Sequence, residues 1–309
     1  MKNKLAFATL CLLATWPLAG CNASPVSSFG EAANGREAAP ASDPKSKDAK
    51  DGGLLGSIFG TDEKTPQPTV SLEGEFDSAK ALRAVYGTYN AEQKRAQWKP
   101  TKEELNRFSF YNNIQTLYSR AYFTKAFQQN GAERYFVITR TAPSKTDCED
   151  CVPVLGGAVF TKTGAEWELN AQSKLITRTG LHGELSAGRL AKIGVEKYGV
   201  LFHWKATNEG IAEEGDLLIA ENKGALKEVF SMITGGDNKK HCEEVGAYAD
   251  DPACWSYRSK LEFVPNASNS FYDLRVTSEG TKQVEENEVL PVRETKRYVY
   301  TETGYRPTR

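Results

Sequence analysis

From residue 120 to residue 301 the sequence repeats one rhythm, in which short runs rich in β-branched and aromatic residues alternate with turns built on Gly and Asn. Residues 120–128 and 134–141 flank Asn130-Gly131, and Asn-Gly between two such runs is the strongest short-range hairpin signal. Further strand-like runs are residues 154–161, 167–171, 189–193, 200–206, 216–220, 226–232, 255–264, 271–277 and 296–301. About a dozen strands at this spacing predict a mainly β, antiparallel domain.

The arrangement of these strands is left open by the sequence. A sandwich and a barrel-like domain both fit the strand count, and a propeller-like arrangement is an alternative, although no repeat period holds along the chain. The turns are predicted at residues 163–164, 208–210, 222–224 and 235–238. The acidic run at residues 213–216 is predicted to lie in a solvated loop, with a weak calcium site as the alternative.

One or two short helices are expected before the strands. Residues 76–86 carry apolar side chains at helical spacing, with Asp77 or Ser78 as the N-cap. The predicted apolar face consists of Ala79, Leu82, Val85 and Tyr86. A second helix is predicted to begin at Thr101, because Thr101 and Glu104 have the spacing of a capping box.

The N-terminus has the layout of a secretory signal, with Lys2 and Lys4 ahead of a mostly apolar run over residues 5–16. This run is too short to cross a bilayer as a mature helix, which needs about 20 residues. The string Leu18-Ala19-Gly20-Cys21 follows, and it resembles the lipobox of bacterial lipoproteins, L-[AS]-[GA]-C. The resemblance implies cleavage between Gly20 and Cys21 and lipid attached to Cys21.

The resemblance also implies a location. Two or three acyl chains make release from a membrane negligible, at roughly 0.8 kcal/mol per buried methylene. Asn22, which follows the lipobox where aspartate would favour the inner membrane, favours the outer membrane in the sorting pattern of such lipoproteins. We therefore expect an outer-membrane lipoprotein, anchored by lipid and facing the periplasm.

Three parts follow along the chain: a signal peptide (1–20), a lipidated disordered tether (21–70) and a globular, mostly β domain (71–309). The tether is rich in Ala, Ser, Pro, Gly, Lys and Asp, which cannot bury enough apolar surface to fold. Its expected reach is roughly 35 to 42 Å. The apolar string GGLLGSIFG at residues 52–60 is either a sticky piece of linker or a short element that docks on the domain, a lipid surface or a partner.

Four cysteines remain once Cys11 leaves with the leader and Cys21 is lipidated. They are Cys148, Cys151, Cys242 and Cys254. An even number in an exported chain predicts two disulfides, because the envelope is oxidising. The preferred pairing joins the first two and the last two, since each pair closes a short loop in a turn-rich segment, and a crossed pairing is the rival.

Cys148 and Cys151 also have the C-x-x-C spacing of thioredoxin-like redox centres. That chemistry requires the motif at the start of a helix, where a thiol pKa is lowered, whereas Pro143 and Pro153 bracket this segment. A zinc site built from these cysteines with His241 would compete with oxidation. Neither a redox centre nor a metal site is predicted.

Motifs of catalysis and of cofactor binding are missing from the sequence. The elbow G-x-S-x-G does not occur, because the segment from Gly183 to Gly188 around Ser186 is one residue too long. His182, His203 and His241 are scattered, and His203 is expected to be a packed or edge residue. No H-E-x-x-H, EF-hand or phosphate-cradling glycine loop is present. We expect no cofactor and no catalytic site.

The composition favours a binding protein. The chain has a formal net charge of −1, and this balance argues against nucleic acid as a partner, which requires a basic surface. Aromatic residues that would anchor an interface, if exposed, are spread through the β region: Tyr111, Tyr118, Tyr122, Tyr135, Trp167, Trp204, Trp255, Tyr257, Tyr272, Tyr298 and Tyr300. The favoured function is non-enzymatic binding of another envelope protein or a glycan. The alternatives are an enzyme acting on cell wall or glycan, and an inhibitor or immunity protein that blocks a wall-degrading toxin with the 242–254 loop.

Overall fold

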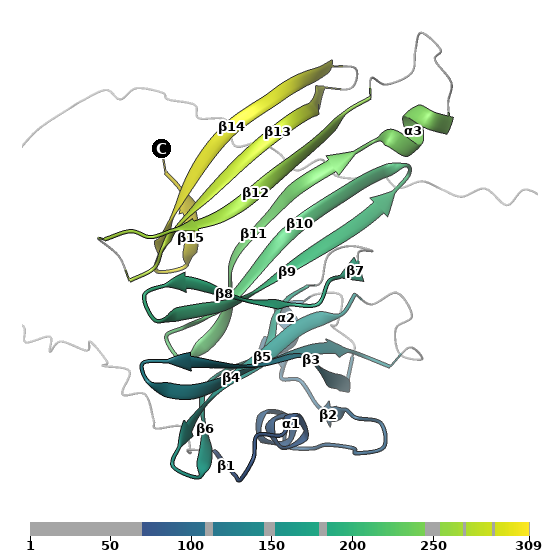
Figure 1. Cartoon of the computed structure of the whole chain (residues 1–309). Helices are drawn as coiled ribbons and strands as arrows, with labels where there is room; N and C mark the ends of the chain where they lie inside the picture. Colours follow the sequence, from purple (N-terminus) through teal and green to yellow (C-terminus); the bar gives the residue numbers. More distant parts are fainter. Residues whose placement is uncertain are drawn as a thin grey trace, which may run out of the picture. The chain divides into compact units, whose positions relative to one another are not determined.

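The computed structural model describes residues 70–108, 114–144, 152–178, 184–244, 254–267, 270–285 and 288–308. All of them belong to one unit, Glu63–Arg309. The expectation of a mainly β, antiparallel domain is confirmed, since the strands form two antiparallel sheets (Figure 1).

The first sheet has six strands in the order β1-β6-β5-β4-β3-β2. Their bounds are β1 Ser71–Glu73, β2 Ala96–Trp98, β3 Leu117–Gln129, β4 Ala132–Ala142, β5 Val154–Thr163 and β6 Glu166–Arg178. The predicted hairpin joins β3 to β4, and both turn residues have positive φ, 53° at Asn130 and 75° at Gly131. This left-handed pair matches the twist of the flanking strands, which is why Asn-Gly is favoured there.

The second sheet has the order β15-β14-β13-β12-β11-β10-β9-β7, and β8 also pairs with β9. The bounds of its first strands are β7 Glu184–Leu185, β8 Arg189–Gly194, β9 Lys197–Asn208, β10 Ile211–Asn222 and β11 Ala225–Asp237. Those of the rest are β12 Ser256–Val264, β13 Asp273–Glu285, β14 Glu288–Thr301 and β15 Gly304–Pro307. The sheet curls into a half-barrel.

Both predicted helices are present. In α1 (Ser78–Tyr86) the side chain of Asp77 accepts a hydrogen bond from the N–H of Ala79, and the helix ends at Gly87 in the left-handed region. In α2 (Lys102–Asn106) Thr101 and Glu104 form the reciprocal capping box. A third helix, α3 (Lys239–Glu244), follows β11 and was not predicted.

Three hydrophobic clusters hold these layers together. One lies between α1 and the first sheet, one between the two sheets, and one inside the curl of the second sheet. Strand β4 serves the first two at once, because Val137 packs in the α1 cluster while Phe136 and Ile138 pack between the sheets. Alternate residues of a strand point to opposite faces, so a strand buried on both sides is apolar at successive positions.

Two local predictions in the second sheet are wrong. Residues 235–238 were predicted as a turn, but Gly235 and Gly236 continue β11 and pair with both β10 and β12. A Cβ at Gly235 would lie 2.7 Å from a carboxylate oxygen of Glu214, and one at Gly236 would lie 3.2 Å from the Trp255 ring. Glycine is therefore used here for close side-chain approach. The acidic run at residues 213–216 lies within β10 and not in a loop.

The outer edge of β14 is only partly covered. Four of its residues, 298–301, pair with β15, and the carbonyl of Arg297 accepts a hydrogen bond from Thr308 on that side. Because every second residue of a strand directs its backbone groups to the same side, Pro291 also faces the open edge. Proline has no N–H to offer there, and charged side chains such as Arg293 and Lys296 follow it. These features discourage an added strand.

Candidate functional site

A groove of about 700 Å³ lies where β10 begins, β11 ends, β12 begins and β13 ends. Its lining comes from four neighbouring strands and the residue just before β12: Ile211, Glu213, Met232, Ile233, Trp255, Tyr257, Lys282, Gln283 and Val284. We call it the Trp255 groove. A volume between roughly 300 and 1,000 Å³ is typical of ligand sites.

Exposed apolar side chains gather around this groove. Among the described residues, five large hydrophobic side chains are exposed: Val195, Ile211, Ile233, Val284 and Leu290. Three of them line the groove, at 40%, 42% and 51% exposure for Ile211, Ile233 and Val284. Leu290 pairs with Lys282, which also lines it. Single exposed hydrophobics are ordinary, but a contiguous group marks an interaction surface.

Small residues around Tyr257 shape the floor of the groove. In the strand register Tyr257 stands between Gly236 on β11 and Gly280 on β13, so its two cross-strand neighbours have no side chains. The Trp255 ring stacks near it at 6.2 Å between centroids, and the ammonium of Lys282 lies 5.2 Å from the centre of the Tyr257 ring. Both aromatic residues are only 9% exposed, so they form a fixed wall.

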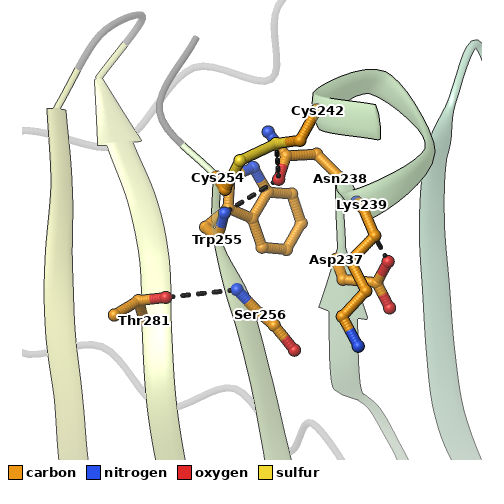
Figure 2. Close-up of a disulfide and its surroundings, with 8 residues drawn as sticks. All are labelled: Asp237, Asn238, Lys239, Cys242, Cys254, Trp255, Ser256 and Thr281. Atoms are coloured by element: carbon orange, nitrogen blue, oxygen red, sulfur yellow. Dashed lines mark hydrogen bonds between the residues drawn. A yellow bond between two sulfur atoms is a disulfide. The ribbon is translucent and has the colours of Figure 1, made fainter. Parts of the chain in front are cut away.

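A disulfide and one asparagine fix the wall in place (Figure 2). Cys242 of α3 and Cys254, just before β12, stand at disulfide distance, in the pairing preferred from the sequence. The buried Asn238 side chain accepts a hydrogen bond of 2.8 Å from the backbone N–H of Trp255 (Figure 2). The backbone N–H of Asn238 donates to the carbonyl of Trp255. The end of β11 is thus tied to the start of β12.

The other predicted pair cannot be placed in the same way. Cys148 and Cys151 lie outside the residues that the structure describes, and so does Cys21.

Charge is distributed unevenly around the Trp255 groove. Burial raises the pKa of the Tyr257 hydroxyl, and the negative charge of Glu213 raises that pKa further. Within the described part of the chain, Glu213 makes no ion pair. The indole N–H of Trp255 is buried there and has no hydrogen-bond partner among these residues. The groove therefore combines an apolar lining with a carboxylate that forms no ion pair with any described residue.

The neighbouring row of side chains points to the opposite face of the sheet and is differently built. It runs Lys205, Glu214, Gly235, Arg258, Glu279 and Arg293 across six neighbouring strands, β9 to β14, in register. Glu214 lies 3.4 Å from the Lys205 ammonium and 3.7 Å from the Arg258 guanidinium. The charged side chains on this face alternate in sign and compensate each other. A charged ligand would therefore gain little by binding there.

A second hollow, of about 400 Å³, lies at the other end of β12 and β13. Its charged groups are also paired. Arg275 binds Glu262 at 2.7 Å, and Arg297 binds the buried Asp273. These pairs leave little for a charged ligand to gain.

The histidine of β9 has no catalytic arrangement. His203 Nδ1 lies 3.2 Å from an Asp216 oxygen, and Nε2 lies 3.5 Å from a Glu214 oxygen. The Oγ of Ser186 accepts from the backbone N–H of His203 at 3.1 Å and donates to the carbonyl of Ala187 at 3.4 Å, so its contact with His203 is to the backbone. His182 lies outside the described residues. Across the described ranges, no three His, Cys, Asp or Glu side chains stand close enough to hold a metal.

The aromatic residues singled out in the sequence mostly fill the core. Trp167, Trp255 and Tyr257 are buried, and the others that the structure describes are half-buried. Sequence inspection therefore found two residues of the groove but missed the exposed aliphatic side chains around them. The one sequence signal for these aliphatic residues was the position of Ile211, which directly follows the predicted turn at residues 208–210.

Comparison with protein families, with curated proteins and with solved structures finds no match to this chain. In the described part of the chain, no helix is both long enough and apolar enough to cross a bilayer.

Proposed function

We propose that this chain is a lipid-anchored protein of the bacterial cell envelope that works without catalysis, by binding another envelope protein at the Trp255 groove. Cys21 would carry the anchor and hold the β domain at the outer membrane, on the periplasmic side. The observation that carries the binding function is the gathering of Ile211, Ile233, Val284 and Leu290 around one groove.

Side chains of this kind favour a protein over a glycan. Sugars are commonly held on open aromatic faces, whereas Trp255 and Tyr257 are nine-tenths covered and offer little free ring. Exposed aliphatic side chains beside a rigid aromatic wall instead suit the apolar core of a protein interface. These side chains are 40% to 51% exposed, so covering the rest of each would contribute about half of the roughly 1.5 to 3 kcal/mol expected for complete burial.

Site-specific photo-crosslinking tests the binding surface. A benzophenone amino acid is placed at Ile233 in the groove, and at Val195, which is 60% exposed in the turn between β8 and β9, as the matched control. We expect a discrete crosslinked product in intact cells from position 233 and none from position 195. Equal labelling from both positions, or none from position 233, would contradict the proposal.

The anchor is tested separately. Replacing Cys21 with serine removes the only thiol of the lipobox, and we expect the protein to move from the membrane fraction to the soluble periplasmic fraction. Intact-mass measurement of the wild-type protein should show acylation at that residue. A Cys21→Ser protein that stays in the membrane fraction would refute lipid at Cys21 as the anchor.

A further inference from the structure

We infer that the Trp255 groove binds a segment of a partner protein in which apolar side chains stand beside a lysine or arginine that pairs with Glu213. This inference rests on the proposed function and adds the chemistry of the partner to it. Three features of the described residues support it: the isolation of Glu213, the acidic surroundings of the groove, and its open, partly charged lining.

Glu213 and Glu214 are adjacent in β10 but differ in their ion-pair partners. Glu214 contacts Lys205, Arg258 and the ring of His203. Glu213 has no ion pair among the described residues, although it lines the groove and its charge acts on the Tyr257 hydroxyl. A lysine or arginine of a partner would give Glu213 an ion pair of the kind that Glu214 already forms.

The surroundings of the groove are acidic as well. Glu209 lies in the turn two residues before Ile211, and Glu288 is the first residue of β14, four residues after Val284. Both are exposed. Lys282 is the one cation among the lining residues, and its ammonium already lies over the Tyr257 ring. The excess negative charge attracts a basic partner segment and opposes the approach of a second copy of the same surface.

The lining also disfavours a lipid chain as the occupant. The groove is open to solvent along its length and includes Glu213, Gln283 and Lys282 among its walls. An acyl chain gains most where all of its surface leaves water, whereas a peptide can meet both the apolar floor and the charged wall. The groove therefore suits a mixed apolar and basic segment.

The test is a selection from a random peptide display library on the full mature chain carrying Cys21→Ser, which removes the lipid. Binders are counter-selected on the same chain with Ile233→Ser, an exposed position that should leave the fold intact. We expect the remaining peptides to combine Leu, Ile, Phe or Trp with Lys or Arg. One enriched peptide, labelled with fluorescein, then serves as the probe in anisotropy titrations.

Glu213→Gln should weaken this probe at least about tenfold, as expected for loss of a close charge pair at an interface. Glu214→Gln is the matched control and should stay within about twofold, because its charge is already satisfied on the other face. Glu213→Lys should enrich acidic peptides in a repeated selection. Circular dichroism melting of each variant checks that the fold persists.

The two levels of the proposal fail differently. Peptides that require Ile233 but lack basic residues, or that bind Glu213→Gln as tightly as wild type, would overturn the inference and leave the binding groove standing. Absence of any binder sensitive to Ile233→Ser would overturn both. Dimerisation by sedimentation that is lost in Ile233→Ser would show a second copy as the occupant and would also overturn the inference.

Discussion

Removal of the disulfide between Cys242 and Cys254 should cost the domain about 3 kcal/mol of unfolding free energy. The two residues are 12 positions apart, so the bond closes a loop of about 13 residues. The loop-closure entropy that such a bond removes from the unfolded chain corresponds to about 3 kcal/mol at room temperature. With a urea m-value of about 2 to 3 kcal/mol per molar, the unfolding midpoint should fall by about 1 to 1.5 M.

The measurement is urea unfolding followed by circular dichroism, in a Cys148→Ser/Cys151→Ser background, so that only one disulfide responds to reductant. Dithiothreitol should lower the midpoint by the stated amount, and a further Cys242→Ser/Cys254→Ser exchange should make the protein indifferent to reductant. Binding at the Trp255 groove should weaken in parallel, because the bond ties Trp255 to the end of β11. A midpoint that reductant leaves unchanged would refute this reasoning.

Two further outcomes concern stability. Phe160→Ala empties a fully buried site between α1 and the first sheet and should cost about 3 to 5 kcal/mol in urea unfolding, whereas Val195→Ala should cost almost nothing; a loss below about 1 kcal/mol would contradict the packing. Burial raises the pKa of the Tyr305 hydroxyl, and Tyr300 and Asp273 raise it further. Since its pKa is higher in the folded than in the unfolded state, this group stabilises the fold below about pH 10, and that contribution is lost as the pH rises above 10. Between pH 8 and 11 the unfolding free energy should decline less steeply with pH for Tyr305→Phe than for the wild type. An unchanged slope would argue against this role of Tyr305.

The features that the sequence predicted correctly depend on neighbouring residues. Asn130-Gly131 determines a hairpin by its own backbone preferences, and Thr101 with Glu104 forms a capping box within one helical turn. The antiparallel class follows from the same local patterns, whereas the short strands β1, β2, β7 and β15 were not predicted. These predictions needed no knowledge of the tertiary fold.

The Trp255 groove could not be predicted in this way. Ile211 and Val284 lie on strands far apart in the sequence, and only the order β10-β11-β12-β13 brings them together. The turn prediction at Gly235 and Gly236 was wrong because glycine signals a turn locally, whereas here it makes room for the side chains of Glu214 and Trp255. The exposed aliphatic residues resemble core residues until the sheets are assembled.

The open edge of β14, with Pro291 in it, limits how this protein can recognise anything. With the lipid anchor proposed above, copies of the chain would be concentrated on one membrane, and an unprotected edge strand would then favour cross-β polymers. Because Pro291 and the charged side chains of β14 discourage backbone pairing at this edge, recognition at the Trp255 groove depends on side chains. Partner choice could then change during evolution through a few substitutions around the groove, with the scaffold untouched.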